Sequence, residues 1–427
     1  MTTDRPEFER VRTMSALTDV EELLGGVEDA VAALFATPCE VVTAWNVASL
    51  ELGVSCGDRA LFEALHAYLG SHAGPASGGR PDVELTFVVS DALAGRLEAT
   101  AVRLPGPQPA MISYCTTEKG SLPVEHWRAG RATLLRTLKT RTWLLADESY
   151  SRLTFVVGDD YPLRPTVHKD LALLILHVLQ RTLEARGQLQ IHASAVVVDG
   201  QAVLFAGPKR SGKTTCFLDA IVRTGARPLS VDKVHLAEDA EGTATGRFQV
   251  FGIPTRLRVL AGTLQKYPGT WDAFIPEEYR GAGEERLWRG ESDSKVSIPL
   301  TSLRAVTGED FTLRAPLGMI VLPDVARGRV PLLREVVDPL EVAELMRPNV
   351  YTPDNPEEDW WSGIGGHLAA DLRARAEAFL AGIGATVPIL RLEGAERIDH
   401  LLQEAWRRLR SGATGPTEAE PIGAPRS

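Results

Sequence analysis

The sequence predicts an α/β protein of two modules, an N-terminal α+β module followed by a larger domain with a mixed sheet. An apolar run at 202–206 indicates a buried strand that leads directly into a Gly-rich turn, and this turn then opens a helix. The stretch 159–165, Asp-Asp-Tyr-Pro-Leu-Arg-Pro, interrupts the apolar segments and is the best domain boundary in the chain. We therefore expect four parts: a flexible arm at 1–19, the N-terminal module at 20–160, the second domain at 165–410 and a disordered tail at 411–427.

The N-terminal module combines strand and helix patterns. We expect helices at 20–35, 58–69 and near 128–138 and strands at 41–42, 50–54, 83–89, 110–115, 142–146 and 153–157. Nothing in the module suggests catalysis, because its histidines have no partner at the spacing of metal ligands: His66, His72 and His126.

The second domain contains further helix and strand patterns on both sides of the Gly-rich turn. We expect helices at 169–186, 339–345, 368–381 and 395–409 and strands at 189–198, 202–206, 319–323 and 387–392. Asp199-Gly200 predicts a two-residue hairpin. Residues 265–294 are rich in Gly, Trp and charge and predict a long insertion that covers a site or is disordered. Residues 354–361 predict an acidic-aromatic turn.

The Gly-rich turn has the spacing of a phosphate-binding P-loop. Its residues are Gly207-Pro208-Lys209-Arg210-Ser211-Gly212-Lys213-Thr214-Thr215. The two glycines allow a tight bend in which successive N–H groups point inward, and the N-terminus of the following helix completes an anion site. Lys213 is expected to reach the β- and γ-phosphates of a nucleotide, and the Thr214 hydroxyl to ligate Mg²⁺.

Composition excludes several classes of function. The 427 residues are 44% hydrophobic and 24% charged, as in ordinary globular proteins, and a net charge of −10 disfavours nucleic-acid or anionic-membrane binding. No run approaches about eighteen uncharged apolar residues and residues 1–12 are polar, so we expect no membrane partner and a cytoplasmic protein. The cysteines lack paired spacing and predict reduced thiols: Cys39, Cys56, Cys115 and Cys216.

Three further segments accompany the P-loop. Residues 191–200, Ile-His-Ala-Ser-Ala-Val-Val-Val-Asp-Gly, place His192 in an antiparallel strand directly before the loop. Together with residues 225–234 and with Gly252-Ile253-Pro254-Thr255, this arrangement resembles the HPr kinase/phosphorylase-like family of P-loop kinases. The resemblance covers about 169–260 well and the remainder to about 410 loosely.

The resemblance implies transfer of the γ-phosphoryl group of ATP to a hydroxyl, with Mg²⁺ as the metal. His192 falls on the family's active-site histidine, and Asp232 falls on the second acid, which activates the acceptor. Lys213 and Thr214 keep their phosphate and metal roles. Physical reasoning agrees, because a carboxylate at the end of a strand beside the loop can accept a hydroxyl proton or hold a metal-bound water.

Two residues depart from the family pattern. Val231 stands where the family often has Asp or Asn, and Gln249 stands near where it has an Mg²⁺-binding Glu. The implied metal set is therefore Thr214, Asp232 and Gln249, with weakened or rebuilt binding. The signature that recognises HPr is not evident, so the expected acceptor is a peptide, another protein or a small molecule. Among members of this broad group, the chain looks more similar to the peptide-tailoring kinases of biosynthetic clusters.

Two classes of function remain open. The first is an ATP-dependent kinase with a hydroxyl acceptor, and the second is a degenerate nucleotide-binding regulatory protein. Asp232 favours the enzyme, because a loop that only binds nucleotide has no need of an acid there, whereas Val231 and Gln249 are losses that a degenerate enzyme would show. The sequence leaves the oligomeric state open and is compatible with a homo-oligomer.

Overall fold

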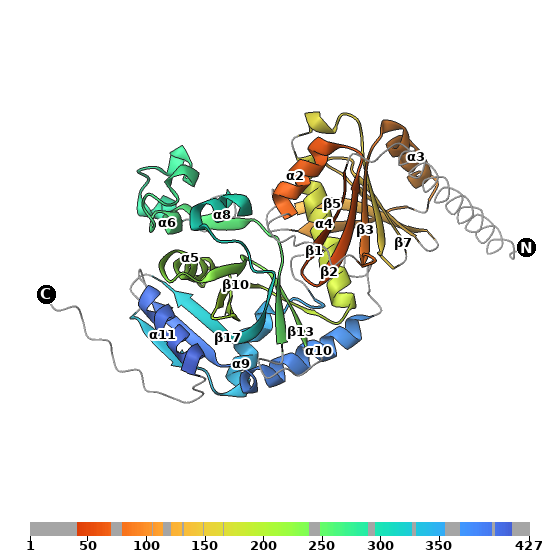
Figure 1. The fold of residues 1–427 in the computed structure, drawn as a ribbon. Coiled ribbons are helices and arrows are strands. Elements are labelled where there is room, and N and C mark those ends of the chain that lie inside the picture. The colour runs from red at the N-terminus through yellow and green to blue at the C-terminus, as the bar shows by residue number, and fades with distance from the viewer. Residues whose placement is uncertain are drawn as a thin grey trace, which may run out of the picture.

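The computed structural model describes residues 41–69, 79–104, 106–113, 121–129, 132–147, 149–164, 166–238, 248–288, 295–326, 330–354, 368–394 and 398–411. The expected arm, the helix at 20–35, most of the acidic-aromatic turn and the tail from 412 onward lie outside these residues. The described chain is a mixed α/β protein with two mixed sheets and helices packed against them (Figure 1).

The first sheet has eight strands in the order β1-β2-β3-β8-β7-β6-β5-β4. The strands are β1 (Val41–Val47), β2 (Leu50–Cys56), β3 (Val83–Val89), β4 (Gln108–Ser113), β5 (Ser121–Ala129), β6 (Ala132–Thr137), β7 (Trp143–Asp147) and β8 (Arg152–Val157). β3 runs parallel to β2 and β8, and the other pairs are antiparallel. α2 (Arg59–Leu69) and α4 (Val167–Ala185) contribute to the apolar cluster on one face, and α3 (Asp91–Ala101), which the sequence did not predict, contributes to the cluster on the other.

The helix predicted near 128–138 is wrong, because β5 and β6 form an antiparallel hairpin there. Leu134 packs into the cluster beneath α3, whereas the next residue, Leu135, packs into the cluster beneath α2 and α4. A strand that buries both faces loses the alternation of apolar and polar residues. Its short apolar run therefore cannot be told from a helical segment by periodicity.

The helix α4 lies between the two sheets. Leu171, Leu174 and Val178 are fully buried in the cluster that also contains the strands of the first sheet. The same cluster includes Phe251 and Ile253 from the second sheet and the segment that follows it. The apolar surface of α4 therefore joins the two modules.

The second sheet has nine strands, with the path β12-β10-β11-β17-β14-β13-β9 and β19 and β18 beyond β17. The strands are β9 (Leu189–Ile191), β10 (Ala193–Val198), β11 (Gln201–Ala206), β12 (Arg227–Ser230), β13 (Val234–Glu238), β14 (Phe248–Gly252), β17 (Arg314–Val325), β18 (Leu332–Glu335) and β19 (Ile389–Gly394). β17 runs parallel to β11 and β19 and antiparallel to β14. The strand predicted at 189–198 is thus divided in two at His192, and the predicted hairpin at Asp199-Gly200 is confirmed by the β10–β11 register.

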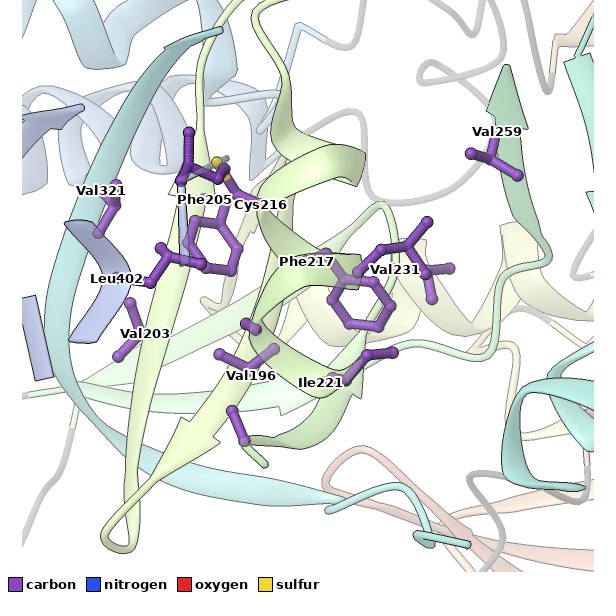
Figure 2. Packing of buried hydrophobic residues seen from close by; sticks show 14 of the residues in the cluster. Val196, Val203, Phe205, Cys216, Phe217, Ile221, Val231, Val259, Val321 and Leu402 are labelled. Carbon is purple, nitrogen blue, oxygen red and sulfur yellow. The ribbon is translucent and has the colours of Figure 1, made fainter. Parts of the chain in front are cut away.

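Two apolar clusters stabilise the second sheet. One contains α5 (Lys213–Arg223) and α11 (Asp399–Ser411), and Figure 2 shows Phe205, Cys216, Phe217 and Val231 within it. The other contains α9 (Pro339–Met346) and α10 (Ala369–Gly382). Val231 is 4% exposed, so the residue that departs from the family's polar pattern is an apolar core residue here.

The predicted insertion is packed rather than extended where the structure describes it. It contains η4 (Asp272–Phe274), η5 (Glu277–Tyr279) and α7 (Glu284–Leu287). It follows β15 (Leu257–Leu260) and α6 (Ala261–Leu264) and precedes β16 (Lys295–Ile298), which pairs with β15, and α8 (Leu300–Thr307). Trp271 is fully buried, and the Tyr267 hydroxyl donates to Asp219 Oδ1 of α5 at 2.6 Å. These contacts attach the insertion to the helix that follows the P-loop.

Within the described residues, no helix combines the length and the apolar character that crossing a bilayer requires.

Candidate functional site

The Gly-rich turn connects β11 to α5, as the sequence predicts. Gly212 precedes α5 with φ of 103°, and a Cβ at this position would lie 2.6 Å from Val325 Cβ at the end of β17. A Cβ on Gly207 would lie 2.8 Å from Ser211 Oγ. Both positions therefore require glycine, the first for its left-handed backbone and both for the close approach of neighbouring groups.

The end of β17 holds the turn in place. Val325 N donates to Ser211 O at 2.8 Å, and Ser211 N donates to Pro208 O at 3.2 Å. The Ser211 side chain is 9% exposed, and its Oγ makes no hydrogen bond to any residue that the structure describes. A buried hydroxyl inside the turn is suited to an oxyanion ligand.

Lys213 lies across the turn. Its Nζ donates to Gly207 O at 2.6 Å and to Pro208 O at 3.1 Å, and the residue is 9% exposed. Of the neighbouring loop residues, Thr214 is half-buried at the start of α5, Thr215 is buried, and Lys209 and Arg210 are exposed. The turn thus joins an ammonium group, backbone amides and a helix N-terminus, which is the chemistry of a phosphate site.

Asp232 lies in the short connection between β12 and β13, and it meets His192 there. His192 Nε2 lies 3.5 Å from Asp232 Oδ1, with side-chain exposures of 11% and 40%. His192 is the single residue between the end of β9 and the start of β10, so it lies outside both strands. The structure therefore brings together the two residues that the resemblance placed in the catalytic set.

The charge of Asp232 is set by its neighbours. Burial alone would raise the pKa of this carboxyl. The contact with His192 and the positive charges of Lys233 and Lys213 outweigh burial and hold the pKa of Asp232 well below its ordinary value. Lys213 of the phosphate loop is therefore close enough to act electrostatically on Asp232, and Asp232 is a carboxylate at neutral pH.

Two residues that sequence reasoning missed complete the site. Asn349 Oδ1 accepts from Gly207 N at 2.9 Å, and Asn349 O accepts from His192 N at 2.8 Å. The Tyr351 hydroxyl lies 2.7 Å from His192 Nδ1. Both residues come from the chain after α9, in no motif, so no sequence signal could have found them.

Gln249, the third predicted metal ligand, lies on β14 and is separated from Asp232 along the β13–β14 ladder. It pairs with Ala237 on β13, three residue pairs from Val234, whereas Asp232 precedes Val234. Three pairs along a ladder correspond to about 10 Å. Among the described residues there is also no group of three or more His, Cys, Asp or Glu that could hold a metal ion. Of the predicted metal set, only Thr214 and Asp232 belong to the region of the loop.

These residues fit the phosphates of ATP. The two glycines let Ser211 and Val325 approach the turn closely, and Ser211 Oγ, the α5 N-terminus and Lys213 offer donors to phosphate oxygens. Mg²⁺ prefers a few protein oxygens together with phosphate oxygens. The Thr214 hydroxyl and the Asp232 carboxylate are oxygens of that kind.

Comparisons with known proteins find a weak structural likeness. No family model matches the sequence, and no curated protein matches it. Among solved structures, the chain is similar to the HPr(Ser) kinase/phosphatase from Coxiella burnetii, with 12% sequence identity and a TM-score of 0.24. That match covers 52% of this chain and 99% of the other. A likeness at this level carries no argument about activity.

Proposed function

We propose that this protein is an ATP-dependent phosphotransferase that moves the γ-phosphoryl group to a hydroxyl of a peptide, protein or small-molecule acceptor. The observation that carries the proposal is the position of Asp232. Its carboxylate lies beside His192 and within electrostatic reach of Lys213, the lysine of the phosphate loop. A carboxylate at this place can hold Mg²⁺ beside the phosphates and can also accept a hydrogen bond from an acceptor hydroxyl, and the second role is the one that a kinase needs.

The loop residues have binding roles in this proposal. The backbone amides of 207–213 and the Lys213 ammonium would hold the β- and γ-phosphates, and Thr214 and Asp232 would hold Mg²⁺. Bound Mg²⁺ would supply charge neutralisation for the transferring group. Lys213 would exchange its bonds to Gly207 O and Pro208 O for bonds to phosphate oxygens.

Asp232 would orient the acceptor rather than act as a strong base. A carboxylate whose pKa is held low takes up a proton poorly. Phosphoryl transfer passes through a loose transition state, so the attacking oxygen carries little charge and can keep its proton until late. Asp232 is suited to accepting a hydrogen bond from the acceptor hydroxyl and to receiving that proton at the end of the step.

The acceptor is the part of the proposal to test first. Peptides are the first candidates, because the signature that recognises HPr is not evident in the sequence. The protein would be incubated with Mg²⁺ and ATP against peptide and amino-acid libraries, and mass spectrometry would follow the gain of one phosphoryl group. We expect phosphorylation that is lost in Asp232→Asn.

The degenerate nucleotide-binding protein is the other outcome of this experiment. Calorimetry would measure ATP affinity in the same samples. If wild-type protein binds ATP but phosphorylates no acceptor, and Asp232→Asn binds ATP equally well, the kinase proposal fails and the regulatory protein is the better description.

A further inference from the structure

We infer that Tyr351 is a positioning residue that holds the His192 ring with Nε2 directed at Asp232. The effect of Tyr351 on catalysis rests on the proposed function. Its effect on the His192 ring can be tested without any turnover. Tyr351 would act through His192 and has no expected contact with the nucleotide.

The geometry around the His192 ring supports this role. The Tyr351 hydroxyl lies 2.7 Å from Nδ1, and Nε2 on the other side of the ring lies 3.5 Å from Asp232 Oδ1. The two rings also contact each other, with centroids 5.0 Å apart. Tyr351 is 3% exposed, so its hydroxyl has little access to bulk water. Both ring nitrogens of His192 are thus engaged by protein groups.

The arrangement fixes one tautomer of the neutral ring. Asp232 is a carboxylate and can only accept, so Nε2 must carry a proton if it is to bond Asp232. Nδ1 of the neutral ring then has a lone pair and accepts from the Tyr351 hydroxyl. The Tyr351 hydroxyl therefore adds to Asp232 in favouring the proton on Nε2, and without it this tautomer is favoured only by the 3.5 Å contact with Asp232.

Tyr351 itself is held on both sides by buried hydrogen bonds. Its N donates to Gln190 O at 2.9 Å, and Val350 forms a bridge with Ile191. The next residue, Thr352, accepts from Gln190 N at 2.7 Å and donates to Glu184 Oε1. The segment 350–352 therefore lies along β9 like a short additional strand, and its tyrosine is placed by the backbone that also carries His192.

Glu184 connects this segment to α4. It forms a buried ion pair with Arg181 at 2.9 Å, and both side chains are at most 1% exposed. Buried groups of this kind restrict their partners to one arrangement when their bonds are made. The position of the Tyr351 hydroxyl is therefore set by the core and does not depend on surface side chains.

The first test is the tautomer of His192. The full chain would be labelled with ¹⁵N-histidine, and the signals of His192 would be assigned by their loss in His192→Gln. In the neutral wild-type ring we expect the proton on Nε2, because Nε2 faces Asp232 and Nδ1 faces the Tyr351 hydroxyl. In Tyr351→Phe the nitrogen shifts of His192 should move toward a mixture of the two tautomers.

The matched control is Tyr150→Phe. Tyr150 is buried, and its hydroxyl bonds Thr133 at 2.9 Å in the first sheet, far along the chain from the loop. This control also loses a buried hydroxyl and should leave the His192 signals unchanged. Unchanged His192 signals in Tyr351→Phe would overturn the inference, as would a neutral wild-type ring that carries its proton on Nδ1.

The second test is kinetic. Tyr351→Phe keeps the aromatic ring, so we expect kcat to fall about tenfold or more, as loss of a group that orients a functional side chain does, while KM for ATP stays within about twofold. Weakened ATP binding with unchanged kcat would instead assign the hydroxyl to the loop and overturn the inference. If wild-type protein shows no turnover, the proposed function fails, whereas the nitrogen shifts still decide whether Tyr351 positions His192.

Discussion

Lys213 is the residue whose removal tests the phosphate loop most directly. Lys213→Ala removes the ammonium that spans the turn, so turnover should fall about a hundredfold or more. The fold should persist, because Nζ bonds loop carbonyls and does not fill an apolar cluster. Phosphoryl transfer and thermal unfolding would be measured together, with Lys139→Ala as the control at an exposed lysine of the first module. Unchanged transfer in Lys213→Ala would remove the loop from the mechanism.

Asp232 separates an enzyme from a binding protein. Asp232→Asn keeps the size of the side chain but removes the charge, so turnover should fall by about a hundredfold while the affinity for ATP without Mg²⁺ barely changes. Calorimetry with and without Mg²⁺ distinguishes the roles, because a residue that mainly places the metal would lower affinity for Mg²⁺-ATP as well. If the variant turns over as fast as wild type, Asp232 is not the catalytic acid and the base must be sought at His192.

The site could be predicted only where its residues belong to a local pattern. The loop residues 207–215 follow one another in the chain, and His192 and Asp232 stand in segments that resemble a known family. Asn349 contacts Gly207 across 142 residues, and Tyr351 contacts His192 across 159. Such contacts depend on how β9 and the segment after α9 are placed by the whole fold, which spacing in one sequence does not reveal.

At the scale of elements, the periodicity of apolar residues predicts a helix or strand correctly when only one face of that element is buried. α2 alternates buried and exposed positions with helical spacing, and the sequence predicts it at nearly its observed bounds. β6 is buried almost throughout, and there the prediction of a helix is wrong. The break at His192 is also not predicted by the sequence, because β9 and β10 are buried at every position and no Gly or Pro marks the end of β9.

The attachment of the insertion to α5 gives a prediction about pH. Burial raises the pKa of Asp219, although the Tyr267 hydroxyl and Arg223 oppose this shift. The folded state therefore keeps a proton that the unfolded chain releases, so the free energy of unfolding falls as pH rises above the ordinary value of 3.8. Asp219→Asn lacks this proton equilibrium and can still accept from Tyr267.

Urea unfolding at several pH values would measure this effect. Between about pH 4 and pH 7, the free energy of unfolding of Asp219→Asn should rise relative to that of wild type. Glu63→Gln, at an exposed position of α2, is the control and should show no such trend. A difference between Asp219→Asn and wild type that is independent of pH would contradict the raised pKa.

At the scale of the whole molecule, the sequence separates the modules near 159–165, and this boundary stays a prediction. α4 follows the boundary, yet it is buried in the apolar cluster of the first sheet. An apolar helix of this kind does not show in its sequence which module it packs against. Polar contacts add to the connection: Gln188 Nε2 donates to Ser49 Oγ at 2.6 Å, and the Arg256 guanidinium lies 5.1 Å from the centre of the Tyr68 ring.

The shared cluster predicts that the two modules unfold as one cooperative unit. Phe248→Ala alters the second sheet alone, and Leu97→Ala alters the cluster beneath α3 alone, so each variant changes only one module directly. Each substitution should lower the free energy of unfolding by about 3 kcal/mol.

Because exchange of core amides follows global unfolding in a cooperative molecule, protection in β3 and in β17 should fall about a hundredfold in both variants. Hydrogen exchange followed by mass spectrometry would measure the two strands in the same sample. A loss of protection confined to the mutated sheet would show that α4 does not couple the sheets, whereas equal losses would establish that the two sheets unfold together.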